Sequence, residues 1–88
     1  MPGAARKGAD SAGGTIISGS SDVFINGQPA ARVGDKVAPH SRRGSHRRAV
    51  LVKGSPDVFV NGIPLVREGD AASCGHPASG SADVLVND

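Results

Sequence analysis

The three histidines and the one cysteine of this 88-residue chain lie in two short stretches. His40 and His46 lie in the first, and Cys74 and His76 lie in the second. Imidazole and thiolate are the ligands of closed tetrahedral zinc sites, so this set is sufficient for one structural zinc ion with no open position. The spacing within each stretch is not that of a zinc finger, so a metal site requires the fold to bring the two stretches together.

Two other interpretations of these residues remain open from their pattern alone. In the first, the histidines are ordinary surface residues and the thiol is inert. In the second, Cys74 is a nucleophile with a histidine as its base. A small chain that is rich in glycine has little volume for a substrate pocket, which disfavours catalysis, so we expect no enzyme activity.

The composition favours a metal, because the chain has little apolar material for a core. It contains thirteen glycines and two phenylalanines, and it has no tyrosine or tryptophan. A chain of this length forms at most a single domain, and such small domains usually need a disulfide, a metal or a partner. One cysteine excludes an internal disulfide. No apolar run is long enough for a signal peptide or a membrane span, so we expect a cytosolic protein unless something larger carries it out.

An arginine cluster surrounds the first pair of histidines. It consists of Arg42, Arg43, Arg47 and Arg48 in a chain of formal charge +2. These side chains are either solvated or attracted to the phosphates of lipid headgroups or nucleic acid. No aromatic residue lies nearby for base stacking, which disfavours recognition of single-stranded nucleic acid.

A repeat in the sequence places the two ligand-bearing stretches in equivalent loops. Residues 54–70, GSPDVFVNGIPLVREGD, nearly repeat residues 19–35, GSSDVFINGQPAARVGD, and residues 80–87, GSADVLVN, form a truncated third copy. A fixed repeat of this kind indicates that each copy is one supersecondary unit. Each stretch follows the Gly-Asp end of one full copy, so the two stretches are related by the repeat.

The Arg-x-Gly-Asp-like segments divide the single domain into three units, at about residues 5–30, 31–65 and 66–88. Three units of this length predict a pseudo-threefold domain rather than an extended solenoid. Equivalent loops would then meet at one end, where the three imidazoles and the thiol would converge. The loop of the first unit, residues 11–18, contains no metal ligand, so all four ligands come from the other two loops.

Short strands and tight turns are expected along the chain. Asn26 and Gly27 follow one short apolar run, and Asn61 and Gly62 follow another. Asn-Gly is a strong hairpin signal, because a type I′ turn needs positive φ at both central residues. No long segment has the apolar spacing of a helix. We therefore predict an all-β domain whose glycines and aspartates serve backbone geometry, with an irregular arm at residues 1–14.

The repeated motif resembles that of a known family. Residues 28–35, QPAARVGD, contain the Pro-Ala-Ala-Arg string that gives the PAAR-repeat family its name, and Val-Phe-Ile-Asn-Gly precedes them. The later copy, IPLVR at residues 63–67, departs from the string but keeps the proline and the arginine aligned. The resemblance covers essentially the whole chain.

This resemblance implies a small conical β-domain that caps the blunt end of a trimeric β-helical spike. Such spikes, of the VgrG type, belong to bacterial type VI secretion systems and related contractile phage tails, and one monomer caps each trimer. Family members hold a zinc ion near the sharp apex through three histidines and one cysteine. His40, His46, Cys74 and His76 match this set in kind and loop.

The function implied by the resemblance is structural. Such a tip sharpens the spike, stabilises its end and helps to breach a target membrane, and it binds effectors or carries them as fused domains. It is assembled in the bacterial cytoplasm and leaves the cell on the spike. The chain ends at Asp88, so we expect no fused toxin, and we expect no specific nucleic-acid partner. The competing function is a small basic module that binds nucleic acid or phospholipid through the loop of residues 42–48.

Overall fold

Two β-hairpins form the regular part of the fold. The structure is a computed structural model that describes residues 1–41 and 44–86. In the first hairpin β1 (Phe24–Ile25) pairs with β2 (Gln28–Pro29), and in the second β3 (Phe59–Val60) pairs with β4 (Ile63–Pro64). Both pairs are antiparallel, so each hairpin turns within two residues.

The turns of both hairpins have the conformation that the sequence predicts. The φ angles are 54° at Asn26 and 80° at Gly27 in the first turn, and 55° at Asn61 and 75° at Gly62 in the second. Positive φ at both central positions is characteristic of a type I′ turn, whose twist matches that of the flanking strands. The prediction of two hairpins is therefore confirmed.

Outside the hairpins, the described residues pair through single bridges between distant segments, such as Ile16 with Val37 and Leu51 with Ala72. The described part of the chain contains no α-helix, and its one helical turn is the 3-10 helix η1 (Gly44–His46). The prediction of a small all-β domain is thus confirmed, although most of its strands are shortened to single bridges. No helix among the described residues is long and apolar enough to cross a membrane.

Three backbone hydrogen bonds form a closed ring at the centre of the molecule. The N–H of Ala5 donates to the carbonyl of Val66 at 2.9 Å, Val66 donates to Ala31 at 3.0 Å, and Ala31 donates to Ala5 at 2.9 Å. Each residue directly precedes the arginine of one repeat unit, and all three are fully buried. The ring therefore joins equivalent positions of three segments that are far apart in the sequence.

Each of these arginines pairs with a buried aspartate of its own segment. The aspartate also accepts the backbone N–H of the arginine, so it closes a tight turn as predicted for the Gly-Asp motifs. The hydrogen bond to its aspartate raises the pKa of the Arg6 guanidinium. The nitrogen–oxygen distances are 2.7 Å in Arg6–Asp10, 3.3 Å in Arg32–Asp35 and 2.9 Å in Arg67–Asp70.

The described residues form a core of two small apolar clusters. Ile16, Leu51 and Val66 are fully buried in the first cluster, which alanine side chains complete. Ile25 of β1 and Val60 of β3 belong to the second cluster. Close approach of backbones lets these small side chains fill the interior, which accounts for the high content of glycine and alanine.

Residues 1–14 contain no helix or strand, as predicted for an irregular segment, but the prediction that they form an arm is wrong. Gly3 forms a bridge with Leu85, and Ala4 forms a bridge with Arg67. Ala4 and Ala12 are fully buried. The segment has no strand period in the sequence because it pairs through single bridges with several partners and not with one continuous strand.

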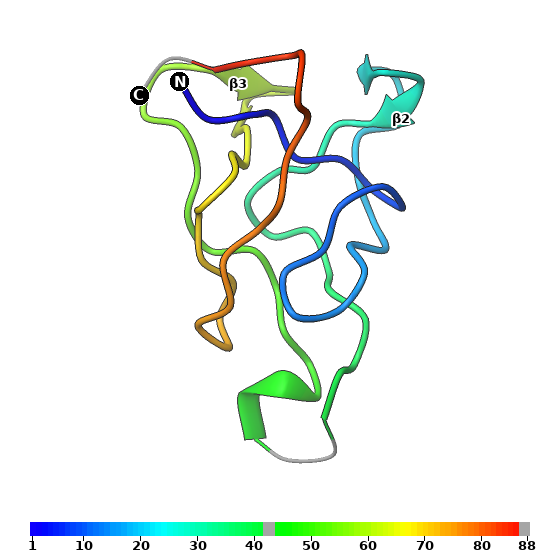
Figure 1. Cartoon of the computed structure of the whole chain (residues 1–88), viewed down its shortest axis with the longest axis vertical. Coiled ribbons are helices and arrows are strands. Elements are labelled where there is room, and N and C mark those ends of the chain that lie inside the picture. Colours follow the sequence, from blue (N-terminus) through cyan, green and yellow to red (C-terminus); the bar gives the residue numbers. More distant parts are fainter. Residues whose placement is uncertain (42–43, 87–88) are drawn as a thin grey trace.

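The hairpins and the 3-10 turn lie at opposite ends of the molecule. The molecule measures 33 × 24 × 23 Å, and Figure 1 shows both hairpins and the C-terminal segment at one end of the longest axis. η1 lies at the other end, where the fold narrows (Figure 1). The long axis thus separates a broad end made of hairpins from a narrow end made of loops.

Candidate metal centre

The four candidate metal ligands lie together. His40, His46, Cys74 and His76 each offer one ligand atom, and these atoms all lie within 4.8 Å of one another. All four residues are half-buried. The fold therefore brings the two ligand-bearing stretches together, as a metal site requires.

The spacing of the ligand atoms fits a small four-coordinate ion. Nε2 of His40 lies 3.1 Å from Nδ1 of His46 and 3.1 Å from Nδ1 of His76, and Sγ of Cys74 lies 3.5 Å from Nδ1 of His76. A tetrahedral zinc ion with its usual bond lengths separates two nitrogen ligands by about 3.3 Å, and nitrogen from sulfur by about 3.6 Å. These three distances match that geometry, and all four ligand atoms lie within 4.8 Å of one another, so the group could bind a metal ion if the wider pairs draw together.

A backbone carbonyl orients the ring of His40. Its Nδ1 atom lies 3.0 Å from the carbonyl oxygen of Ala38. A carbonyl can only accept, so Nδ1 carries the hydrogen and Nε2 presents a lone pair toward the cluster. Metal-binding histidines are commonly fixed in this way through their second nitrogen. The tautomer assigned from this contact is the one that ligation through Nε2 requires.

Two tight loops present the other ligands. The N–H of His40 donates to the carbonyl of His46 at 3.2 Å, which closes the first loop, and His46 is the last residue of η1. In the second loop, the N–H of Ala72 donates to the carbonyl of His76 at 3.0 Å. Gly75 has a φ of 91°, so it provides the left-handed turn that places Cys74 and His76 on one side of this loop.

The loop of the first unit, residues 11–18, lacks a metal ligand but its backbone still lies against the cluster. Gly13 has a φ of 87°, and a Cβ atom at this position would collide with Nδ1 of His76 and lie 2.7 Å from Nε2 of His40. A Cβ atom on Gly14 would collide with the carbonyl of Ala38, the group that orients His40. The backbone of this loop therefore covers the cluster, which requires glycine at both positions.

Sequence reasoning missed the role of Gly13 and Gly14 because it searched for side chains that can ligate. The only signal in the sequence is a pair of adjacent glycines in the loop that is equivalent to the two ligand-bearing loops. The carbonyl of Ala12 also lies 3.9 Å from Sγ of Cys74. The equivalent loops of all three repeat units thus meet at the cluster, although only two of them supply candidate ligands.

The predicted phosphate-contact residues lie in the same loop as the first two histidines. Arg47 and Arg48 directly follow η1, and both are exposed. Arg42 and Arg43 lie outside the described residues. The described half of the arginine cluster is therefore available at the surface beside the metal-ligand group.

The donor set of the cluster is the one that structural zinc sites use. Four protein ligands complete a tetrahedral shell, so they leave no position for a water molecule or a substrate. An ion held this way would tie the two loops together in a domain whose apolar clusters are small.

Comparison with known proteins identifies the family. The sequence finds no match among curated proteins. A family model described as the PAAR motif matches residues 8–79, a range that contains both hairpins and all four members of the histidine–cysteine cluster. Because the match covers most of the 88 residues, this chain belongs to the PAAR-motif family.

Proposed function

We propose that this chain is the structural tip that caps the trimeric, VgrG-type β-helical spike of a type VI secretion system or of a related contractile phage tail. Membership of the PAAR-motif family supports a spike-tip function. The tip sharpens and stabilises the end of the spike and helps it to breach a target membrane, and it has no turnover of its own. It is assembled in the bacterial cytoplasm, leaves the cell on the spike and links effectors to it.

The observation that carries the proposal is a set of three exposed apolar side chains at equivalent repeat positions. Phe24, Phe59 and Leu85 are 57%, 55% and 50% exposed. The residue that follows each of them is buried. β1, β3 and the C-terminal segment all lie at the broad end of the molecule (Figure 1). Exposed apolar groups gathered at one end indicate an interaction surface.

A pseudo-threefold arrangement of the units 5–30, 31–65 and 66–88 would explain how one chain fits a trimer. The closed ring of Ala5, Ala31 and Val66 supports this arrangement, because each member donates to one partner and accepts from the other. A chain with three similar apolar sites can contact three identical subunits at once, which a chain with one such site cannot. We therefore expect one chain per spike trimer.

We further propose that His40, His46, Cys74 and His76 hold one zinc ion at the narrow end. Mixed imidazole and thiolate ligands in a closed tetrahedral set suit zinc. The ion would fix the loops at the end of the molecule that meets the target first. Its role is mechanical stability of the tip.

Native mass spectrometry with a purified trimeric β-helical spike fragment tests the capping function. We expect one chain bound per trimer. A variant with Phe24→Ser, Phe59→Ser and Leu85→Ser should lose this complex, while Val52→Ser, which removes an apolar side chain that is 52% exposed at a different repeat position, should retain it. Equal binding by the triple variant would contradict capping through the broad end.

The alternative function is phosphate recognition by the loop of residues 42–48. The exposure of Arg47 and Arg48 supports it. Binding to nucleic acid would weaken steeply with salt, because each phosphate contact releases counterions. Replacing all four arginines of the cluster by serine should then abolish binding to anionic liposomes or DNA. Unchanged binding of the variant would exclude this function.

A further inference from the structure

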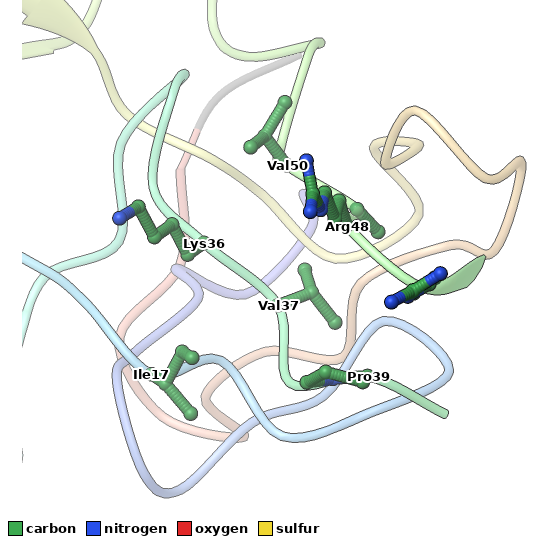
Figure 2. A pocket seen from close by; sticks show the side chains of 8 residues that line it. Ile17, Lys36, Val37, Pro39, Arg48 and Val50 are labelled. Carbon is green, nitrogen blue, oxygen red and sulfur yellow. The ribbon is translucent and has the colours of Figure 1, made fainter. Parts of the chain in front are cut away.

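A groove with an apolar floor and a cationic rim lies beside the candidate metal centre. It has a volume of about 300 Å³ and is drawn in Figure 2. Val37 and Ala49 form its base and are almost completely buried, while Ile17, which lies at its edge, is 46% exposed. The groove is small for a ligand site, at the lower end of the usual range of about 300–1,000 Å³. It has room for a projecting side chain and not for a large cofactor.

The rim of the groove carries three positive charges, from Lys36, Arg47 and Arg48. No carboxylate among the described residues forms an ion pair with them, whereas the three arginines of the repeat motifs each pair with an aspartate. A second hollow shares Arg47 and Arg48 with the groove and adds Ser41 to its lining. The groove thus shares its cationic side with a neighbouring hollow.

From this arrangement we propose that the groove binds an acidic segment of a partner protein, with one aliphatic side chain on the floor and carboxylates against Arg47 and Arg48. Guanidinium groups match carboxylates in geometry as well as in charge. These three cations, which form no ion pair within residues 1–41 and 44–86, provide the charge complementarity that selects an acidic partner and excludes a basic one.

The shape of the groove favours a protein segment over a membrane. The apolar atoms at its base, on Val37 and Ala49, lie below the surface, so only a group that projects from the ligand can reach them. A membrane surface instead takes up apolar side chains that project from the protein. A short peptide with one protruding aliphatic side chain meets both the apolar floor and the cationic rim.

The proposed site is separate from the proposed spike-docking surface. Residues 36–39 and 47–50, which line most of the groove, lead to and from η1, whereas the hairpins lie at the opposite end (Figure 1). A partner in the groove therefore leaves the exposed side chains of Phe24 and Phe59 free. The inference does not rest on the spike-capping function, and either can fail without the other.

Fluorescence anisotropy with a labelled synthetic peptide, Gly-Glu-Asp-Leu-Asp-Glu-Gly, tests the proposal on the full chain. We expect saturable binding at low salt. The double variant Arg47→Ser/Arg48→Ser should bind about tenfold more weakly, since two exposed charge pairs are lost. Ile17→Asp should weaken binding similarly by placing a like charge beside the peptide. Lys53→Ser and Val52→Ser change exposed residues outside the groove and should leave the affinity unchanged.

Two companion peptides separate the apolar and the charged contributions. Replacement of the peptide leucine by alanine should reduce affinity, and so should conversion of its acids to amides. Equal binding of the alanine peptide, or no saturable binding of the first peptide, would overturn the proposal. Binding to vesicles of phosphatidylglycerol and phosphatidylcholine that depends on Arg47 and Arg48, without peptide binding, would also overturn it and would assign the rim to lipid. Thermal melting confirms that each variant is folded.

Discussion

Nε2 of His40 lies 3.1 Å from Nδ1 of His76, although the two residues are 36 positions apart in the sequence. Nε2 of His40 is also 3.1 Å from Nδ1 of His46. Because Nδ1 of His40 donates to the carbonyl of Ala38, its Nε2 holds a lone pair that faces both neighbours. A cation at the centre of the cluster would be attracted by this lone pair. The cluster could therefore hold a metal ion, and we expect the stability of the fold to depend on one.

Removal of one ligand should abolish both metal binding and folding. We expect about one zinc per chain by elemental analysis, and loss of the zinc together with cooperative thermal melting in His40→Ala and in Cys74→Ala. In small metal domains the binding free energy, of the order of 10 kcal/mol, is largely the folding free energy. Lys53→Ala, an exposed change away from the cluster, serves as the control. A stably folded protein without metal would show that the ligand assignment is wrong.

A methyl group on Gly13 should weaken metal binding by displacing the rings of two ligands, although Gly13 is not itself a ligand. Gly13→Ala places its Cβ atom against Nδ1 of His76 and Nε2 of His40. Gly34→Ala is a matched control, because Gly34 has a similar φ of 94°, against 87° at Gly13, but a Cβ atom there meets nothing within 4 Å. Both variants should lose about 1–2 kcal/mol of stability, because an alanine is strained at positive φ.

Zinc affinity separates the two glycine variants. Competition with a chromophoric chelator should show an affinity about tenfold to a hundredfold lower for Gly13→Ala, the range found when the surroundings of a metal site are disturbed. Gly34→Ala should keep the affinity of the unmodified chain. Equal affinities would mean that the loop of residues 11–18 does not constrain the ligands.

The hairpins and the candidate ligands were predictable because their signals are local or chemical. The φ values at Asn26 and Gly27 follow from the residues themselves, and histidine and cysteine are conspicuous in a chain that has few of them. The burial of Ala4 and the position of Gly13 were not predictable in the same way. Both depend on which distant segment of the chain packs against the residue. A single bridge, unlike a strand, produces no alternation of apolar and polar residues in the sequence.

Loss of the charge on Asp10 should destabilise the fold substantially. This buried carboxylate accepts hydrogen bonds from the backbone and side chain of Arg6 and from the hydroxyl of Ser79 at 2.8 Å. Asp10→Asn should lower the free energy of unfolding by about 2–3 kcal/mol, because it leaves a partly buried guanidinium without its counter-charge. Urea denaturation measures the change. Glu68→Gln, a change at an exposed carboxylate, is the control, and its free energy of unfolding should stay within about 0.5 kcal/mol of that of the unmodified chain. An equally small effect of Asp10→Asn would contradict the structural role of the Arg6–Asp10 pair.

The carboxylate of Asp22 should add a component to acid denaturation. Hydrogen bonds from Asn61 and from Ser20 lower the pKa of Asp22 in the folded chain. Its contribution to stability is therefore fully present above the unfolded pKa of about 3.9 and is lost as the pH falls through the lower folded value.

Thermal melting of the unmodified chain and of Asp22→Asn, in steps from about pH 5 to pH 2, tests this linkage. The unmodified chain should melt at the higher temperature at pH 5, and the difference should shrink as the pH falls. Metal release in acid removes the cooperative transition of both proteins, so the comparison is made over the pH values at which both still melt cooperatively, where the difference between them isolates the carboxylate. A difference that does not vary with pH would assign the effect of the substitution to something other than charge.

The ring of Ala5, Ala31 and Val66 has a kinetic consequence. Bringing Ala5 and Ala31 together costs the entropy of closing a long loop, but it forms only the hydrogen bond from Ala31 to Ala5, which is one of the three in the ring. The other two bonds form only when Val66 arrives. Each hairpin can form within about 1–10 μs, well before three distant segments can meet. We therefore expect the meeting of three distant segments to limit the folding rate, and a chain synthesised only as far as residue 65 cannot close the ring.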